Sequence, residues 1–249
     1  MIRAETTSGV RVVTLARSEK RNALTPAMID DLAAEAADES GDWSALLLVG
    51  EGPVFCAGFD LDLCREDPPD QPTMRRFLEA LHGAILALRR QPRPVVLCAH
   101  GAAVAGGCAL LGGADVVVAD RAAKLGYPVS RLGVSPAISA PFLRLGAGDG
   151  NARSMLLDPG LFTGERAHIA GLVHILAESA EAARVTAMET AMSLAAKPRG
   201  AMAETKRWTN ACAEALGAEA GLAASMSLVG GEEAVAMLSA AWRSKEKKP

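Results

Sequence analysis

Two apolar runs, at 94–99 and 114–119, constrain the fold of this chain most strongly. They read PVVLCA and ADVVVA, and neither has a charged residue among its valines. Runs of this composition are typical of strands that are covered on both faces of a sheet. RVVTLA at 11–16 and ALLLVG at 45–50 have the same character. We therefore expect an α/β core whose sheet carries helices on both sides.

Helical patterns fill the stretches between and after these strands. The segment 24–40 begins with a capping threonine and a first-turn proline, and apolar residues recur at helical spacing over 74–88. Beyond 178 the sequence indicates four helical stretches and no strand. We expect a core over 1–195 followed by a helical region over 196–249.

Charge and hydropathy exclude several classes of partner. The 249 residues carry a formal net charge of −3 and are 50% hydrophobic, so no strong field favours nucleic acid or a membrane surface. No apolar run approaches the ~20 residues of a membrane span. The first sixteen residues lack the layout of a signal peptide, so we expect a cytoplasmic protein with no membrane or nucleic-acid partner.

The cysteines indicate reduced thiols. There are five, Cys56, Cys64, Cys98, Cys108 and Cys212, and no CxxC pair or His/Cys cluster. An odd number without such spacing favours small buried side chains over a disulfide framework or a metal site. The sequence contains no GxGxxG, GxSxG or Walker pattern, which argues against those nucleotide-binding and hydrolase classes.

The glycine pair Gly106-Gly107 follows the run at 94–99 within AHGAAVAGGCALLGGADVVVAD (99–120). Glycine lets another group approach the backbone closely, because no side chain stands in the way. At the start of a helix, backbone N–H groups lack partners within the helix and carry a partial positive charge. We therefore expect another group to come close to the backbone at this pair, although close packing between helices is the alternative explanation.

Three stretches in order resemble the crotonase superfamily, the enoyl-CoA hydratase and isomerase group. They are VTLARSEKRNALTPAM (13–28), GPVFCAGFDLDLC (52–64) and RPVVLCAHGAAVAGGCALLGGADVVVAD (93–120). Two later stretches, 162–176 and 198–210, are similar to further elements of the family. The resemblance implies a spiral of ββα turns with two roughly perpendicular sheets, and a C-terminal helical region that completes a homotrimer or a dimer of trimers.

The resemblance also implies a site for an acyl-CoA thioester. The backbone N–H groups of Phe59 and Gly106 would hold the thioester oxygen as negative charge develops on it. Coenzyme A would arrive as part of the substrate, with no permanently bound cofactor and no metal. The family's coenzyme A site corresponds here to Lys20, Arg21, Ala23, Leu24, Ala57 and Asp60, of which Asp60 occupies a position that is usually structural. Tail lysines, Lys206 and the group at 245–248, are candidates for contacts with phosphates, with plain surface charge as the alternative.

This sequence departs from the family at both acid–base positions. Hydratases carry one glutamate three residues after the oxyanion glycine and a second after a Gly-x-Pro element. Here the corresponding residues are Ala109 and Val129. Neither side chain can orient or deprotonate water, so hydration by the usual route is not expected.

Two other side chains are candidates for proton transfer or hydrogen bonding. His82 lies beside the apolar stripe of the 74–88 helix, and Tyr127, the only tyrosine, lies near the second missing acid. Each has a structural alternative, as a half-buried or packing residue. Two functions therefore stay open: an enzyme of the enoyl-CoA hydratase/isomerase type with non-standard acid–base groups, and a non-catalytic acyl-CoA-binding protein.

Overall fold

The larger of two sheets forms the centre of the computed structural model, which describes residues 1–68, 71–214, 222–223, 226–227 and 229–246. Its first pair of strands is antiparallel and every later pair is parallel. In spatial order the strands are β1 (Ile2–Thr7), β2 (Val10–Leu15), β3 (Ala45–Gly50), β4 (Val95–Cys98), β6 (Val116–Asp120) and β9 (Ile175–Ala177). The four strands expected from the sequence are thus confirmed as β2, β3, β4 and β6.

A second, smaller sheet is built from the segments that follow the central strands. It consists of β5 (Ala102–Val104), β7 (Lys124–Gly126) and β8 (Phe162–Thr163). The chain passes from β4 to β5 and from β6 to β7, so each turn contributes one strand to each sheet. This alternation winds the core as a spiral.

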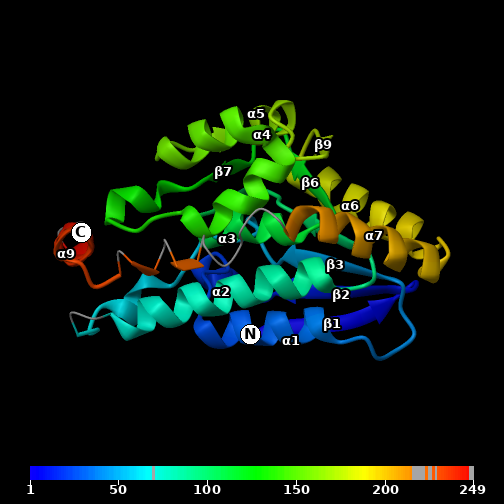
Figure 1. The fold of residues 1–249 in the computed structure, drawn as a ribbon, viewed down its shortest axis with the longest axis horizontal. Coiled ribbons are helices and arrows are strands. Elements are labelled where there is room, and N and C mark those ends of the chain that lie inside the picture. Colours follow the sequence, from blue (N-terminus) through cyan, green and yellow to red (C-terminus); the bar gives the residue numbers. More distant parts are fainter. Residues whose placement is uncertain (69–70, 215–221, 224–225, 228, 247–249) are drawn as a thin grey trace.

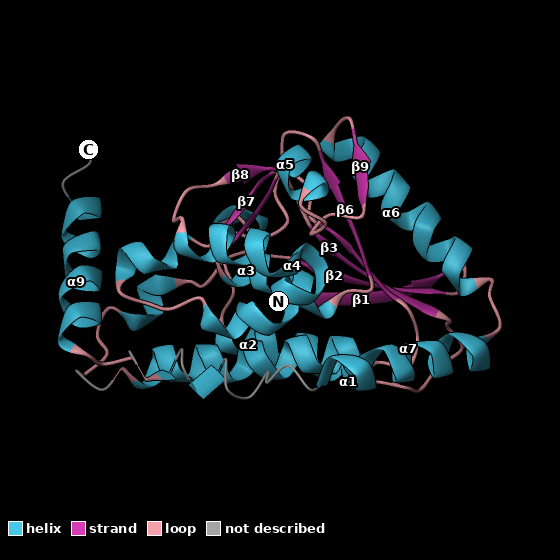
Figure 2. Ribbon diagram, turned by 45° about the horizontal axis from the view of Figure 1, so that its top comes forward, coloured by secondary structure: helices cyan, strands magenta, loops and turns pink. Residues whose placement is uncertain are grey.

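Helices cover both faces of the larger sheet, as expected from its apolar strands (Figures 1 and 2). On one face lie α1 (Pro26–Ala37) and α2 (Pro72–Arg90), and on the other lies α6 (Ala180–Ala195). The buried residues of α6 are alanines at 183, 187 and 191, so this helix can approach the valines of the sheet closely. The Thr25 hydroxyl accepts a hydrogen bond from the Met28 N–H at 3.2 Å and caps α1.

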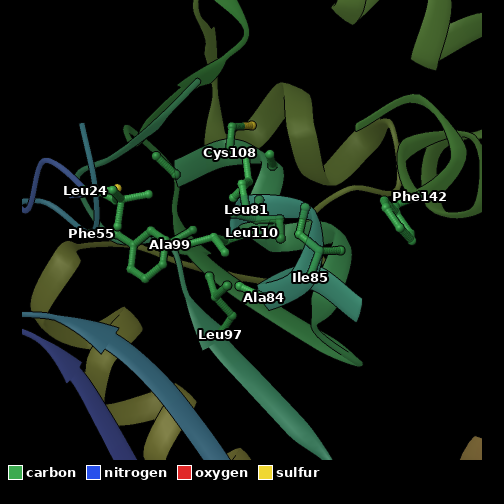
Figure 3. Packing of buried hydrophobic residues seen from close by; sticks show 14 of the residues in the cluster. Leu24, Phe55, Leu81, Ala84, Ile85, Leu97, Ala99, Cys108, Leu110 and Phe142 are labelled. Carbon is green, nitrogen blue, oxygen red and sulfur yellow. The ribbon is translucent and has the colours of Figure 1, made fainter. Parts of the chain in front are cut away.

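The apolar core on the first face lies between α2 and the central strands. Figure 3 shows Leu81 and Ile85 of α2 close to Leu97 of β4 and to Leu110. All four side chains are buried. Burial of this apolar stripe fixes α2 against the sheet.

The remaining helices surround the small sheet and the end of the core. They are α3 (Gly106–Ala109), α4 (Ala140–Leu157), α5 (Gly164–Ile169), α7 (Arg199–Glu214) and α9 (Glu232–Glu246). Three of the four helical stretches expected beyond 178 are therefore confirmed as α6, α7 and α9. Most of the third stretch, at 218–229, lies outside the described residues. Among the described residues no helix is long and apolar enough to cross a membrane.

The helices of the tail contact their own chain. Gly133 packs so closely on Ala234 of α9 that an added Cβ would overlap the Ala234 backbone. Lys206 of α7 is buried, and its ammonium bonds to the Asp115 carboxylate at 2.6 Å and to the carbonyls of Leu88 and Arg93 at 3.2 Å each. Burial lowers the pKa of this lysine. In the described chain Lys206 is therefore an anchor between α7 and the core, and its ammonium is occupied there and is not presented to a phosphate. The side chains at 245–248 lie outside the described residues.

His100 generates a prediction about pH. Its side chain is fully buried at the turn between β4 and β5, with Nδ1 3.4 Å from the Cys98 carbonyl oxygen and Nε2 3.3 Å from that of Gly52. Burial, and then the positive charge of Arg184, lower its pKa from the ordinary value of 6.5. The unfolded chain therefore binds more protons than the folded chain below about pH 6.5, and stability falls as the pH falls through this window.

We expect His100→Asn to flatten the decline in unfolding free energy between pH 7 and pH 5. The contribution of one histidine is at most about 1.4 kcal/mol per pH unit. Urea denaturation at several pH values measures it, with the exposed His168→Gln as the matched control. An equal slope in His100→Asn and in the unchanged protein would contradict the prediction.

Candidate functional site

The segment 56–60 lies between the chain at 21–24 and strand β5. The Leu24 N–H donates to the Gly58 carbonyl and the Asp60 N–H donates to the Leu24 carbonyl, each at 2.8 Å. On its other side Cys56 pairs in parallel with Ala103 of β5. Phe59 stands between the two residues that bond to Leu24, and its own N–H has no hydrogen-bond acceptor among the described residues. This amide is therefore available to a ligand.

A second amide comes from the start of α3. Gly106 is the first residue of this helix, and its N–H has no acceptor in the described part of the chain. The preceding residue, Ala105, has φ 53° and ψ −117°, a backbone conformation that residues other than glycine rarely adopt. Such strain costs on the order of 1–3 kcal/mol and persists only where the surroundings impose it. Here the Ala105 N–H bonds to the Gly126 carbonyl at 2.8 Å, which holds the turn.

The two turns that carry these amides pack directly on each other. A Cβ added to Gly58 would lie 3.7 Å from the nitrogen of Gly106, and one added to Gly106 would lie 2.8 Å from the ring of Phe59. Gly58 also has a φ of +96°, which favours glycine. The structure thus packs the turns that carry Phe59 and Gly106 against each other.

A cavity of about 160 Å³ opens beside both amides. Its walls come from the segment 57–61, from α2, from the start of α3 and from the chain over 127–139. Besides Phe59, Gly106 and the strained Ala105, the lining residues are Ala57, Leu61, Met74, Leu78, Leu81, Val104, Ala109, Tyr127, Pro128, Val129, Leu132, Val134, Ser135, Pro136, Ile138 and Ser139. Among these described residues the only polar side chains are hydroxyls, so the cavity suits an apolar group and offers few hydrogen bonds to a polar one.

Both positions that the resemblance matches to the hydratase glutamates face this cavity. Ala109 of α3 and Val129 of the segment Pro128–Leu132 are lining residues. No carboxylate or imidazole belongs to the lining described here. The cavity therefore supplies no group of the usual kind for proton transfer at neutral pH.

Tyr127 is the polar side chain with the best-defined role in the wall. It is buried, and its hydroxyl donates to the Cys108 carbonyl at 3.4 Å. Burial raises the pKa of this phenol well above its usual value. Tyr127 is therefore a neutral hydrogen-bond donor at physiological pH, and a phenolate base is disfavoured.

The structure does not bring His82 to the cavity wall. The histidine belongs to α2 and is buried, whereas the neighbouring residues Leu78 and Leu81 are the ones that line the cavity. The described structure gives His82 a place inside the core.

Arg17 is a residue that the sequence reasoning missed. Its guanidinium bonds to the Asp60 carboxylate at 2.7 Å and to the Ala23 carbonyl at 2.9 Å. Asp60 is 9% exposed and Arg17 16% exposed, so the pair is largely shielded from water. A basic residue two positions after the end of β2 and an acid directly after Phe59 were the signals available, but neither reveals the pairing. Asp60 is thus engaged within the protein, beside the amide of Phe59.

Lys20, Arg21 and Leu24, which are also expected near coenzyme A, lie on the loop over 20–24. Lys20 is half exposed, with its ammonium 3.9 Å from the Asp62 carboxylate. Arg21 has a left-handed backbone, and its carbonyl accepts from the Ala57 N–H at 3.0 Å. Leu24 is fully buried. The loop therefore offers main-chain groups and exposed basic side chains at the edge of the segment that carries Phe59.

The thiols and possible metal ligands add no reactive group. Cys56, Cys64, Cys98 and Cys108 are buried and free, and burial raises the pKa of Cys56 to about 12 and that of Cys108 to about 11. The side chain of Cys212 is outside the described residues. The part of the chain described here contains no group of three side chains suited to a metal ion.

Comparisons with known proteins identify relatives of one family. The family model "Enoyl-CoA hydratase/isomerase" matches residues 5–236. The chain is 31% identical to the 1,2-epoxyphenylacetyl-CoA isomerase of Escherichia coli over 196 residues, which are 76% of this chain and 74% of that protein. It is 32% identical to the cyclohexa-1,5-dienecarbonyl-CoA hydratase of Thauera aromatica over 139 residues, 56% of this chain and 52% of that one.

Solved structures match over nearly the whole chain. An enoyl-CoA hydratase/isomerase from Xanthobacter autotrophicus Py2 has a TM-score of 0.86 at 25% identity and covers 100% of this chain and 98% of its own. An enoyl-CoA hydratase from Mycobacterium smegmatis has a TM-score of 0.83 at 28% identity, with coverages of 97% and 89%. These matches confirm the fold class expected from the sequence, an α/β crotonase-like spiral.

The Arg17–Asp60 pair generates a prediction about stability. Arg17→Met leaves the Asp60 carboxylate shielded from water without its counter-ion, so we expect a loss of about 2–4 kcal/mol. Lys20→Met removes an exposed pair with Asp62 and should cost less than about 1 kcal/mol. Chemical denaturation of both variants provides the comparison.

A third variant separates lost charge from lost packing. Arg17→Met combined with Asp60→Asn removes both charges. The double variant should therefore lose less unfolding free energy than the sum of the losses in Arg17→Met alone and Asp60→Asn alone. Equal losses of unfolding free energy in Arg17→Met and Lys20→Met would contradict the prediction, because the buried pair would then stabilise the fold no more than the exposed pair.

Proposed function

Because the chain belongs to the enoyl-CoA hydratase/isomerase family, the crotonase superfamily, we propose that it binds acyl-CoA thioesters through the backbone N–H groups of Phe59 and Gly106. The thioester oxygen would lie between the two amides, and the acyl group would occupy the apolar cavity beside them. One observation carries the proposal: two amides without described acceptors, on turns packed against each other, border the same cavity.

The chemistry of this arrangement is stabilisation of negative charge. Removal of a proton from the acyl α-carbon moves charge onto the thioester oxygen, where two fixed N–H donors would meet it. Preorganised donors of this kind contribute roughly 3–4 kcal/mol each to a transition state. The strained turn at Ala105 and the bonds on either side of Phe59 support such preorganisation, because they hold the donors before a ligand arrives.

Hydration by paired carboxylates is not part of the proposal. General acid–base groups contribute about 10²–10⁴-fold each, and the positions matched to them carry Ala109 and Val129. The single O–H of the neutral Tyr127 is donated to the Cys108 carbonyl, so it would have to leave that bond to meet a substrate oxygen. A proton-transfer reaction would need Tyr127, His82 after rearrangement of α2, or a group brought by the ligand.

For the coenzyme A portion we propose the loop over 20–24 together with Ala57 and Asp60. The loop is bonded to the segment that carries Phe59, so pantetheine contacts and the oxyanion amide would be held as one unit. Lys20 and Arg21 would meet phosphates. The main-chain groups near Ala23 would meet pantetheine or adenine.

The alternative function is a non-catalytic acyl-CoA-binding protein. The observation that favours it is the lining of the cavity, in which the described residues include neither a carboxylate nor an imidazole. The same pocket would then hold the thioester without turning it over. We further propose a cytoplasmic homotrimer or dimer of trimers, supported by exposed apolar side chains such as Leu157 and Ile169.

Three measurements on the same protein test these functions. Calorimetry with butyryl-CoA should show binding, and NMR in D₂O should show exchange of the α-protons if an enolate forms. Crotonyl-CoA should be hydrated far more slowly than by a hydratase that has both glutamates. Binding without exchange selects the non-catalytic function, and absence of binding to any acyl-CoA contradicts the proposal.

Restoring the carboxylates generates the prediction of this subsection. We expect Ala109→Glu combined with Val129→Glu to raise crotonyl-CoA hydration at least tenfold, because two carboxylates could then hold and activate water. The matched control is Ala109→Gln with Val129→Gln, which has nearly the same shape and no charge. A folded double glutamate variant no faster than its glutamine control would contradict the match of these two positions to the hydratase acids.

A further inference from the structure

A second, larger cavity of about 420 Å³ lies against the acyl cavity. Its walls come from α2, the chain over 109–116, α4, the chain near 171–174 and α7. Apolar side chains such as Leu111, Phe142 and Leu143 form part of this wall. The function proposed above leaves this space without a role.

The two cavities share three lining residues, Ala109, Tyr127 and Ser139. These three residues face both cavities, so the two cavities adjoin each other there. All three residues are at most 3% exposed, so the contact between the cavities is in the interior. Ala109 contributes only a methyl group to this wall. A glutamate at the same position would add four heavy atoms beyond Cβ at the junction.

We infer that the acyl cavity continues past Ala109 into the larger cavity, so that the ligands of this protein are thioesters with long acyl tails. This inference rests on the proposed function, since the thioester group must first be held at Phe59 and Gly106. A short acyl group would fill the smaller cavity alone. The tail of a longer one would pass between Ala109, Tyr127 and Ser139.

The charged groups of the larger cavity favour an uncharged tail. Lys206 and Asp115 neutralise each other at 2.6 Å. The Arg89 guanidinium donates to the Gly112 carbonyl at 2.9 Å and lies 5.4 Å from the centre of the Phe142 ring. These groups already have protein partners, so a carboxylate at the end of the tail would have to displace them. A hydrocarbon tail needs no such exchange.

The test is a series of saturated acyl-CoAs, butyryl, octanoyl and dodecanoyl, measured by calorimetry below their micelle concentrations. Each buried methylene strengthens binding by up to about fourfold. We expect dodecanoyl-CoA to bind at least 30-fold more tightly than butyryl-CoA, with the gain continuing beyond octanoyl.

Variants that fill the larger cavity locate the tail. Leu143→Trp, a lining residue of the larger cavity alone, should weaken dodecanoyl-CoA at least tenfold and change butyryl-CoA less than threefold. Thr209→Trp, at the exposed rim of the same cavity, provides a second variant if Leu143→Trp does not fold. Ala201→Trp, exposed on the same helix as Thr209 and outside the lining, is the matched control.

The outcomes separate this inference from the function on which it rests. Equal affinity for octanoyl- and dodecanoyl-CoA, or dodecanoyl affinity unchanged by a folded tryptophan variant at 143 or 209, overturns the inference and leaves thioester binding intact. Failure of every acyl-CoA to bind overturns the proposed function itself. Selective loss of the long-chain ligand in the filled variants supports both.

Discussion

The position of one short segment, 56–60, is the constraint on which the rest of the site depends. Backbone hydrogen bonds join it to the chain at 21–24 on one side and to β5 on the other. The Arg17–Asp60 pair ties the same two segments through side chains. Because both flanks are occupied, the Phe59 amide is left as a donor beside the start of α3. The segment bridges the small sheet, through Cys56 and Ala103, to the loop at 21–24, so the geometry of the site depends on the backbone pairing of the core.

The cavity beside this segment explains why the family alone does not specify a reaction. In the proposed function the fold supplies fixed backbone donors, which would meet a thioester oxygen whatever side chains surround them. Proton transfer depends instead on a few side chains, and at the two positions matched to carboxylates the cavity presents a methyl and an isopropyl group. Burial keeps the Tyr127 phenol neutral. Under the proposed function such a pocket would hold a thioester and favour its enolate without a carboxylate to activate water.

Much of the fold and part of the site could be predicted from local patterns. The valine-rich runs specified buried strands because no other element hides such segments so completely, and Thr25 and Pro26 marked the start of α1. The pair Gly106-Gly107 indicated a close approach to the backbone, and in the structure the Phe59 ring and Cys56 pack against these two glycines. Lys206 was expected at the surface, but it is buried and bonded to Asp115. Local patterns could not show this pairing, because the two residues are 91 positions apart in the sequence. Arg17 was missed for the same reason, since its partner Asp60 lies on another turn of the spiral.

The sequence by itself determined the class of fold, the pairing of Phe59 with Gly106 as a hypothesis, and the absence of acids at positions 109 and 129. The strand and helix patterns follow from residue type and order, whereas the pairing and the two acid positions were implied by the resemblance of the motifs to the family. The tertiary structure alone decided that His82 lies in the core, that Arg17 holds Asp60, and that Ala109 faces two adjoining cavities. Such facts depend on which segments meet in space, and contacts between residues far apart in the chain leave no mark on local sequence.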